Sequence, residues 1–108
     1  SERVFPGYNV MGTAKAALEN EVIQLAHDLG SDGIRVNAIS PGPLDTVSSR
    51  VISGYRDMKR AHQTRSPMGR NVTHEEAAGT ALFLSSDLST GITGQIIKVD
   101  TGYGIMGI

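Results

Sequence analysis

The sequence has no cysteine and no tryptophan among its 108 residues. The lack of cysteine excludes disulfides, thiolate metal sites and a cysteine nucleophile, and it is typical of a protein from a reducing compartment. Three histidines are present, His27, His62 and His74. None lies three or four residues from another, which is the spacing that places two metal ligands on one face of a helix. We therefore predict no metal site.

The sequence also has almost no excess of either charge, because 10 Lys and Arg residues balance 11 Asp and Glu residues. Without a basic block the sequence has no electrostatic footprint for nucleic acid or a membrane surface. No apolar run approaches the roughly 20 residues that span a bilayer, and the first residues carry no signal-peptide pattern. These absences predict a cytoplasmic protein without nucleic-acid or membrane partners. Because the sequence starts at Ser1 without Met, we also expect a piece of a longer protein.

The clearest helix is predicted for residues 9–29, where no proline occurs. Its apolar residues recur with the three- and four-residue spacing of one buried stripe. The stripe consists of Met11, Ala14, Leu18, Val22, Leu25 and Leu29. We predict that Gly30 ends this helix with a positive φ, because glycine has no Cβ to clash there.

Two further helices are predicted, one weak and one well marked. The weaker one covers residues 46–61. Its apolar side chains fall on neighbouring turns, at Val51, Ile52, Tyr55 and Met58. Thr73 and Glu76 have the spacing of a capping box, in which each side chain accepts a hydrogen bond from the backbone of the other. We expect the helix that they open to reach about residue 85.

Two short strands are predicted from the β-branched segments at residues 34–39 and 95–100. After the first, Pro41-Gly42-Pro43 can continue neither a ladder nor a helix, so a loop must start at the carboxyl end of that strand. Helical segments separate the strands, and the pattern therefore predicts half of a parallel α/β sheet. Two strands cannot cover these helices. Further strands are expected N-terminally or from a partner chain.

Tyr8 and Lys15 are a candidate chemistry-bearing pair. Seven residues amount to about 20° less than two helical turns, so both side chains share one face, roughly 10 Å apart along the axis. Gly12 on that face would let a ring or a ribose approach the backbone. A phenol with a pKa of ~10 becomes a useful acid when a cation supports its oxyanion, and Lys15 is that candidate cation. The alternative is an amphipathic tyrosine and a solvated lysine.

Residues 8–19 resemble the active-site helix of the enoyl-acyl-carrier-protein reductases, a divergent branch of the short-chain dehydrogenase/reductase family. That branch spaces its Tyr and Lys seven residues apart, whereas classical members space them four apart, where this sequence has Met11. Residues 35–43 are similar to the family's strand and Pro-Gly loop, and residues 99–100 to its last strand. The resemblance covers nearly the whole chain. Thr101 departs from it, because many relatives have glycine there.

The resemblance implies an α/β fold, the C-terminal portion of a Rossmann-like doubly wound parallel sheet. Residues 1–108 would form the C-terminal part of a single Rossmann-like reductase domain whose N-terminal cofactor-binding half is absent. The implied reaction reduces the trans-2 double bond of an enoyl-acyl-carrier-protein thioester by hydride transfer in fatty acid elongation. NAD is the expected cofactor, with NADP as the alternative, and a homotetramer is the expected assembly.

The implied catalytic residues are Tyr8, which would stabilise the enolate oxygen, and Lys15, which would orient the cofactor. The implied cofactor-binding residues are Lys15, Pro43, Leu44, Asp45, Thr46, Val47 and Ser48. The Leu44 backbone would bind the nicotinamide carboxamide and Thr46 the pyrophosphate. The implied substrate-binding residues are Tyr8, Ile52, Tyr55 and Met58. For the loop a plain proline-rich turn is the alternative, and for the apolar lid it is core packing.

Two other functions remain open. The loop and strand motifs also fit another short-chain dehydrogenase/reductase, with a ketoacyl or alcohol substrate. A non-catalytic fragment or binding module would keep the same residues without the cofactor-binding half.

Overall fold

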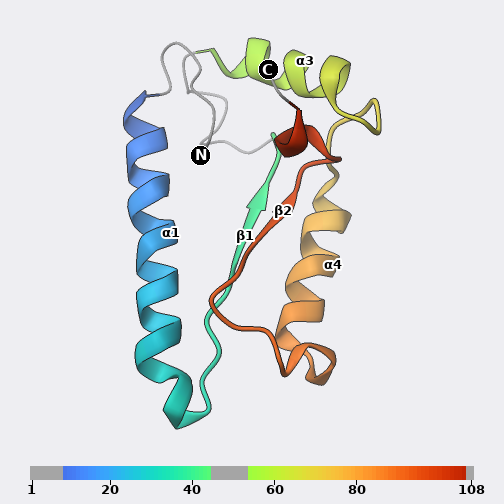
Figure 1. Cartoon of the computed structure of the whole chain (residues 1–108). Coiled ribbons are helices and arrows are strands. Elements are labelled where there is room, and N and C mark those ends of the chain that lie inside the picture. The colour runs from blue at the N-terminus through green and yellow to red at the C-terminus, as the bar shows by residue number, and fades with distance from the viewer. Residues whose placement is uncertain (1–8, 45–53, 107–108) are drawn as a thin grey trace.

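The computed structural model of the chain describes residues 9–44 and 54–106, and for residues 9–15 it describes the backbone alone. Two strands and three longer helices form the framework (Figure 1). These are α1 (Asn9–Leu29), β1 (Ala38–Pro41), α3 (Tyr55–Arg65), α4 (His74–Ser85) and β2 (Ile96–Val99). Short 3-10 helices cover Gly30–Asp32, Asp87–Ser89 and Tyr103–Ile105.

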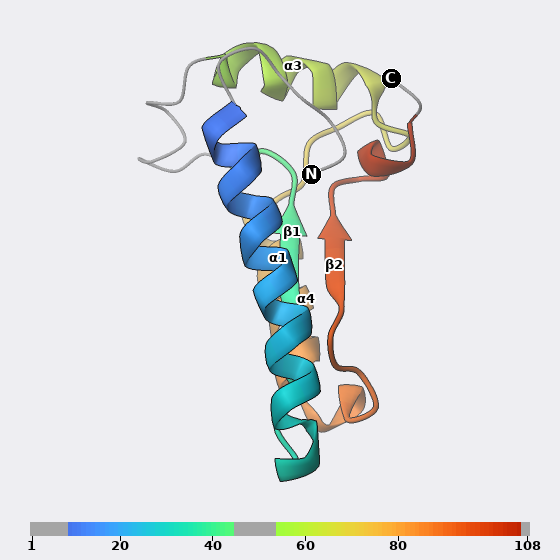
Figure 2. The same ribbon diagram turned by 60° about the vertical axis from the view of Figure 1, so that its left-hand side comes forward.

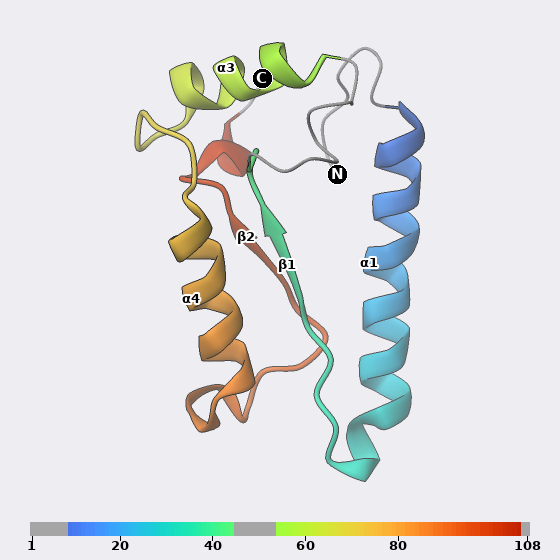
Figure 3. The ribbon, with the colours of Figure 1, turned by 180° about the vertical axis from the view of Figure 1, so that it is seen from behind.

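The two strands pair in parallel, from Ala38 with Ile96 to Pro41 with Val99. This pairing confirms the predicted parallel α/β sheet. Helix α1 lies on one face of the strands and α4 on the opposite face (Figure 2). Helix α3 crosses the carboxyl ends of both strands, as the view from behind shows (Figure 3). Within the described ranges, no helix is long and apolar enough to cross a membrane.

Helix α1 has the predicted bounds, but the prediction that Gly30 takes a positive φ was wrong. A 3-10 turn over Gly30–Asp32 continues the helix, and Gly33 then takes the left-handed conformation with a φ of 77°. Both glycines stand in the same short connection. The additional turn moves the positive φ from the first glycine to the second.

The first strand was predicted too early, because the ladder begins only at residue 38. The segment before it is held by side chains instead. The Arg35 guanidinium donates to the carbonyls of Leu84 at 3.0 Å and Ile92 at 3.1 Å. The Asn37 amide also donates to the Ile92 carbonyl, at 2.9 Å. These hydrogen bonds connect the carboxyl end of α4 and the turn before β2 to the segment that leads into β1.

The predicted capping box of α4 is confirmed. The Thr73 hydroxyl accepts from the Glu76 amide at 3.1 Å, and the Glu76 carboxylate accepts from the Thr73 amide at 2.9 Å. Helix α3 differs from its prediction. It begins at Tyr55 after Gly54, which has a φ of 81°, and it continues beyond the predicted end to Arg65. Residues 45–53 lie outside the described part of the chain.

Candidate functional site

The candidate site lies at the carboxyl ends of β1 and β2. Open α/β sheets bind their ligands at this end, because the loops that leave the strands converge there. The start of α1, helix α3 and the turn after β2 gather around it (Figure 1). Pro43 is buried and Leu44 half-buried where the loop leaves β1. The structure thus places these two predicted cofactor-binding residues at the ligand-binding end of the sheet.

The predicted catalytic pair is only partly described. Lys15 belongs to the first half of α1, which starts at the same end of the molecule, and its backbone alone is described. Tyr8, Asp45, Thr46, Val47, Ser48 and Ile52 lie outside the described residues. The joint action of Tyr8 and Lys15 therefore stays a prediction.

Two predicted substrate-binding residues lie on α3. Tyr55 is buried, with 9% of its surface exposed, and Met58 is half-buried. Their helix crosses the strand ends, as a covering segment would (Figure 3). Burial agrees equally with contact to an acyl chain and with packing inside the protein, so their role stays a prediction.

Gly42 is the point at which three segments approach the loop after β1. A Cβ atom at this position would lie 3.3 Å from His62 Nδ1, 3.4 Å from Val72 Cγ1 and 3.5 Å from Asp100 Cα. The Gly42 amide also extends the ladder by donating to the Val99 carbonyl at 3.0 Å. The missing side chain therefore allows α3 and the end of β2 to close against the loop.

The turn after β2 is fixed by the Asp100 carboxylate. Its oxygens accept from the amides of Gly102 at 3.1 Å and Gly104 at 2.9 Å. Thr101, which directly follows Asp100, has a φ of 55°, in the left-handed region that favours glycine. The Thr101 hydroxyl lies 2.7 Å from the Arg70 carbonyl oxygen, to which it can donate. The residue that departs from the family pattern thus occupies a glycine-type backbone conformation and gains a distant hydrogen bond.

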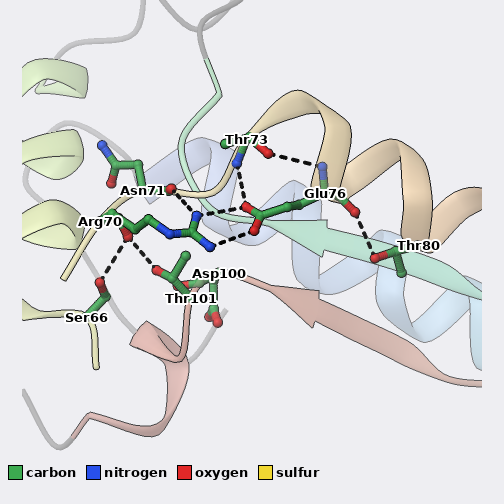
Figure 4. Close-up of polar contacts among 8 residues, drawn as sticks. All are labelled: Ser66, Arg70, Asn71, Thr73, Glu76, Thr80, Asp100 and Thr101. Atoms are coloured by element: carbon green, nitrogen blue, oxygen red, sulfur yellow. Dashed lines mark hydrogen bonds and ion pairs between the residues drawn. The ribbon is translucent and has the colours of Figure 1, made fainter. Parts of the chain in front are cut away.

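Arg70 and Glu76 form a two-pronged ion pair beside this turn (Figure 4). The two guanidinium nitrogens of Arg70 donate to the two Glu76 oxygens at 3.0 and 2.7 Å. The hydrogen bond from Arg70, supported by the Thr73 amide, lowers the pKa of the Glu76 carboxyl to about 2. The same pairing raises the pKa of the Arg70 guanidinium.

The Arg70 carbonyl joins this pair to its surroundings, because the Ser66 hydroxyl donates to it at 3.1 Å. Together with Thr101, these contacts hold the segment between α3 and α4 against the end of β2 (Figure 4). The capping box was the one part of this network that the sequence predicted. In the described ranges no group of three or more His, Asp or Glu side chains could hold a metal ion.

Sequence reasoning also missed the contact between His62 and Tyr103. Their rings stack with centroids 3.8 Å apart and planes inclined by 19°. The two residues come from α3 and from the turn after β2, and no local spacing relates them. A tertiary contact of this kind leaves no periodic signal in a single sequence.

Parallel strands between helices, with a proline-glycine loop at their carboxyl ends, define part of a Rossmann-like α/β enzyme fold. The profile of a family described as Enoyl-(Acyl carrier protein) reductase matches residues 1–104. The chain belongs to this family, as the resemblance of its motifs predicted.

Known enoyl reductases are similar to this chain in both sequence and structure. The enoyl-[acyl-carrier-protein] reductase [NADH] FabI of Rickettsia prowazekii is 50% identical over 107 residues, which are 99% of this chain and 41% of that protein. The Bacillus cereus enoyl-acyl carrier protein reductase, solved with NADP+ and indole naphthyridinone, is 51% identical with a TM-score of 0.92. The reductase of Anaplasma phagocytophilum, solved in complex with NAD, is 48% identical with a TM-score of 0.90.

This chain covers 42% of the Bacillus cereus structure and 41% of the Anaplasma phagocytophilum structure, while 99% of the chain itself is aligned in both cases. The chain therefore spans about two fifths of the length of the relatives that it matches. The agreement with these structures confirms the predicted Rossmann-like α/β fold.

Proposed function

We propose that the 108 residues are the C-terminal part of a single Rossmann-like reductase domain. The domain reduces the trans-2 double bond of an enoyl-acyl-carrier-protein thioester with hydride from a nicotinamide cofactor, in fatty acid elongation. The observation that carries this proposal is the identity of about half the residues, along 99% of the chain, with enoyl reductases. Its cofactor-binding half corresponds to the part of those relatives that the chain does not cover.

NAD is the proposed cofactor, with NADP as the alternative. The Rickettsia prowazekii relative is named for NADH, and solved relatives hold NAD or NADP+. The position of the loop after β1 supports this proposal, because the loop leaves the carboxyl end of the sheet, where open α/β sheets bind their ligands. Pro43 and Leu44, its described residues, carry no charge. When bound, the cofactor supplies the hydride.

The residues of this chain position the reactants and stabilise charge. Tyr8 donates a hydrogen bond to the thioester carbonyl oxygen and stabilises the negative charge that develops there. Lys15 binds the nicotinamide ribose and adds positive potential beside the phenol. Pro43, Leu44, Asp45, Thr46, Val47 and Ser48 line the cofactor. Ile52, Tyr55 and Met58 cover the acyl chain and exclude water from it.

The proposed assembly is a cytoplasmic homotetramer with no nucleic-acid or membrane partner. Exposed apolar residues support association, because Leu82, Leu88 and Ile105 have 73%, 83% and 82% of their surface exposed. Apolar surface of this kind is typical of surfaces that other chains cover. Light scattering on the complete protein should give the mass of four subunits, and the mass of one subunit would contradict this assembly.

The test of the reaction follows NADH oxidation by the complete reductase with a crotonyl thioester. Tyr8→Phe should lower kcat by about 10²- to 10³-fold, because it removes the donor to the developing oxyanion. Lys15→Ala should raise the KM for NADH and lower kcat, whereas Glu21→Ala, a change of an exposed charged residue on the same helix, should leave both unchanged. Wild-type rates in both site variants would contradict the proposal. Faster turnover of a ketone than of the enoyl thioester would favour a ketoacyl or alcohol dehydrogenase.

A further inference from the structure

Helix α3 crosses the strand ends at the candidate site (Figure 3). Among the described residues, it makes no extensive contact with another helix or strand. Individual side chains hold it within this part of the chain, among them buried Tyr55 at its start and His62 near its end.

Tyr103, on which the His62 ring stacks, is held in a fixed position. Tyr103 is buried, with 4% of its surface exposed, and its ring stacks on the imidazole at a centroid distance of 3.8 Å. Its amide donates to the Asp100 carbonyl at 3.1 Å, within the turn that the Asp100 carboxylate closes. The ring of Tyr103 is thus tied to the end of β2 through the main chain.

His62 also lies near the proposed cofactor loop. The imidazole Nδ1 is 3.3 Å from the position that a Cβ atom on Gly42 would take, so the absence of a side chain on Gly42 lets the ring approach the loop. One side chain of α3 therefore stacks on the turn after β2 and lies close to the loop after β1.

The same face of α3 carries the proposed substrate contacts. Seven residues separate Tyr55 from His62, about 20° short of two full turns, so the two side chains share one face of the helix. A displacement of α3 at His62 would therefore move Tyr55, together with the nearby Met58.

We propose that His62 is a positioning residue. Its stack on Tyr103, beside the loop at Gly42, fixes α3 over the carboxyl ends of the strands, and thereby sets the affinity for the acyl part of the substrate. This role rests on the proposed function. His62 itself acts through Tyr55 and Met58, which it holds in place, and not on the reacting atoms.

The test compares His62→Ala with His62→Phe in the complete reductase. His62→Ala removes the ring stack and should raise the KM for a crotonyl thioester by about 3- to 10-fold, the range expected for one aromatic pair. The kcat should change by less than about twofold, because the acyl group loses binding energy equally in the ground state and in the transition state. His62→Phe keeps a flat ring and should restore the KM to within about twofold. Gln63→Ala, an exposed change on the same helix, is the control.

A wild-type KM in His62→Ala would overturn the proposal, as would a failure of His62→Phe to restore it. A purely structural role would lower the melting temperature without separating KM from kcat, and that result would also overturn it. Amide hydrogen exchange over residues 55–65 gives a readout that needs no turnover. Exchange should be faster in His62→Ala and return to the wild-type rate in His62→Phe, and unchanged exchange would overturn the anchoring. If the wild-type protein reduced no enoyl thioester, the proposed function would fail while the exchange comparison still tested the anchor.

Discussion

Helix α1 and the segments around Arg70 are stabilised in different ways. On α1, Leu18 and Leu25 keep 60% and 42% of their surface exposed, whereas Val22 and Ala26 are buried. Around Arg70, the hydroxyls of Ser66 and Thr101 and the Glu76 carboxylate find partners within the described part of the chain, whereas the buried Asn71 Oδ1 accepts no hydrogen bond there (Figure 4). A short stretch of chain can supply most of the hydrogen-bond partners that a polar network needs. An apolar helix face needs an extended surface against it, which the two described strands do not supply.

The largest effect on the free energy of unfolding is expected for Arg35→Ala, which tests how much the polar contacts of Arg35 stabilise the folded protein. The change leaves the carbonyls of Leu84 and Ile92 without the guanidinium that they share. The free energy of unfolding should fall by about 2–3 kcal/mol, the range for hydrogen bonds to a charged group in a partly buried position. Urea denaturation of the complete protein measures it, with Arg56→Ala, an exposed residue, as the control. A loss below about 1 kcal/mol would show that these carbonyls find other donors.

A somewhat smaller effect is expected for Leu18→Asn, which tests the uncovered face of α1. If other parts of the complete protein cover this face, the change should cost about 1.5–2 kcal/mol, because a buried leucine loses its transfer free energy. Asn20→Ala, at an exposed position on the same helix, should change the unfolding free energy little. Equal effects of the two changes would mean that Leu18 faces solvent in the complete protein as well.

Two substitutions of Thr101 separate the effect of its backbone conformation on stability from the effect of its hydrogen bond. Thr101→Val keeps the branched side chain at a φ of 55° but loses the bond to the Arg70 carbonyl, and it should cost about 1 kcal/mol. Thr101→Gly loses the same bond but relieves the left-handed backbone, so the net change should stay within about 0.5 kcal/mol. The difference in melting temperature between these variants measures the backbone contribution. Identical melting temperatures would show that no strain is present at Thr101.

The smallest effect is expected for Glu76→Gln, because 38% of the glutamate side chain is exposed and solvent screens its pairing. The folded protein lowers the pKa of Glu76 from 4.5 to about 2, so its charged form stabilises the fold. This contribution is fully present above the ordinary pKa and is lost as the pH falls towards the lowered one. The difference in melting temperature between wild type and Glu76→Gln should therefore shrink from about pH 6 to about pH 3. The control is Glu75→Gln, and a difference that grew on acidification would contradict this assignment.

Local signals predicted the elements whose ends depend on neighbouring residues. The stripe of α1 and the Thr73–Glu76 capping box each lie within one helix, and both helices have the predicted bounds to within a residue. The start of β1 could not be predicted in the same way. It depends on where β2 begins its ladder, and Ala38 pairs with Ile96 from the far end of the chain. The side chains of Arg35 and Asn37 occupy the place where the pattern predicted further strand.

For the site, the sequence predicted the location better than the contacts. The proline-glycine motif correctly placed a loop at the carboxyl end of β1, and Pro43 and Leu44 lie there. The motif was wrong about where the ladder stops, because Pro41 pairs with Val99 and the Gly42 amide still donates to the Val99 carbonyl. The stack of His62 on Tyr103 had no local signal, because it arises only when α3 folds across the strand ends. The roles of Tyr8 and Lys15 came from family resemblance and stay predictions.

The bare backbone of Gly42 has a consequence for sequence variation. Because a Cβ atom at position 42 would stand only 3.3 Å from Nδ1 of His62, a side chain there would press on the imidazole and require it to shift. Alanine at position 42 should be accommodated most easily where position 62 carries a smaller or differently placed side chain. Across enzymes with this loop, the two positions are therefore expected to covary in size, although they belong to different elements.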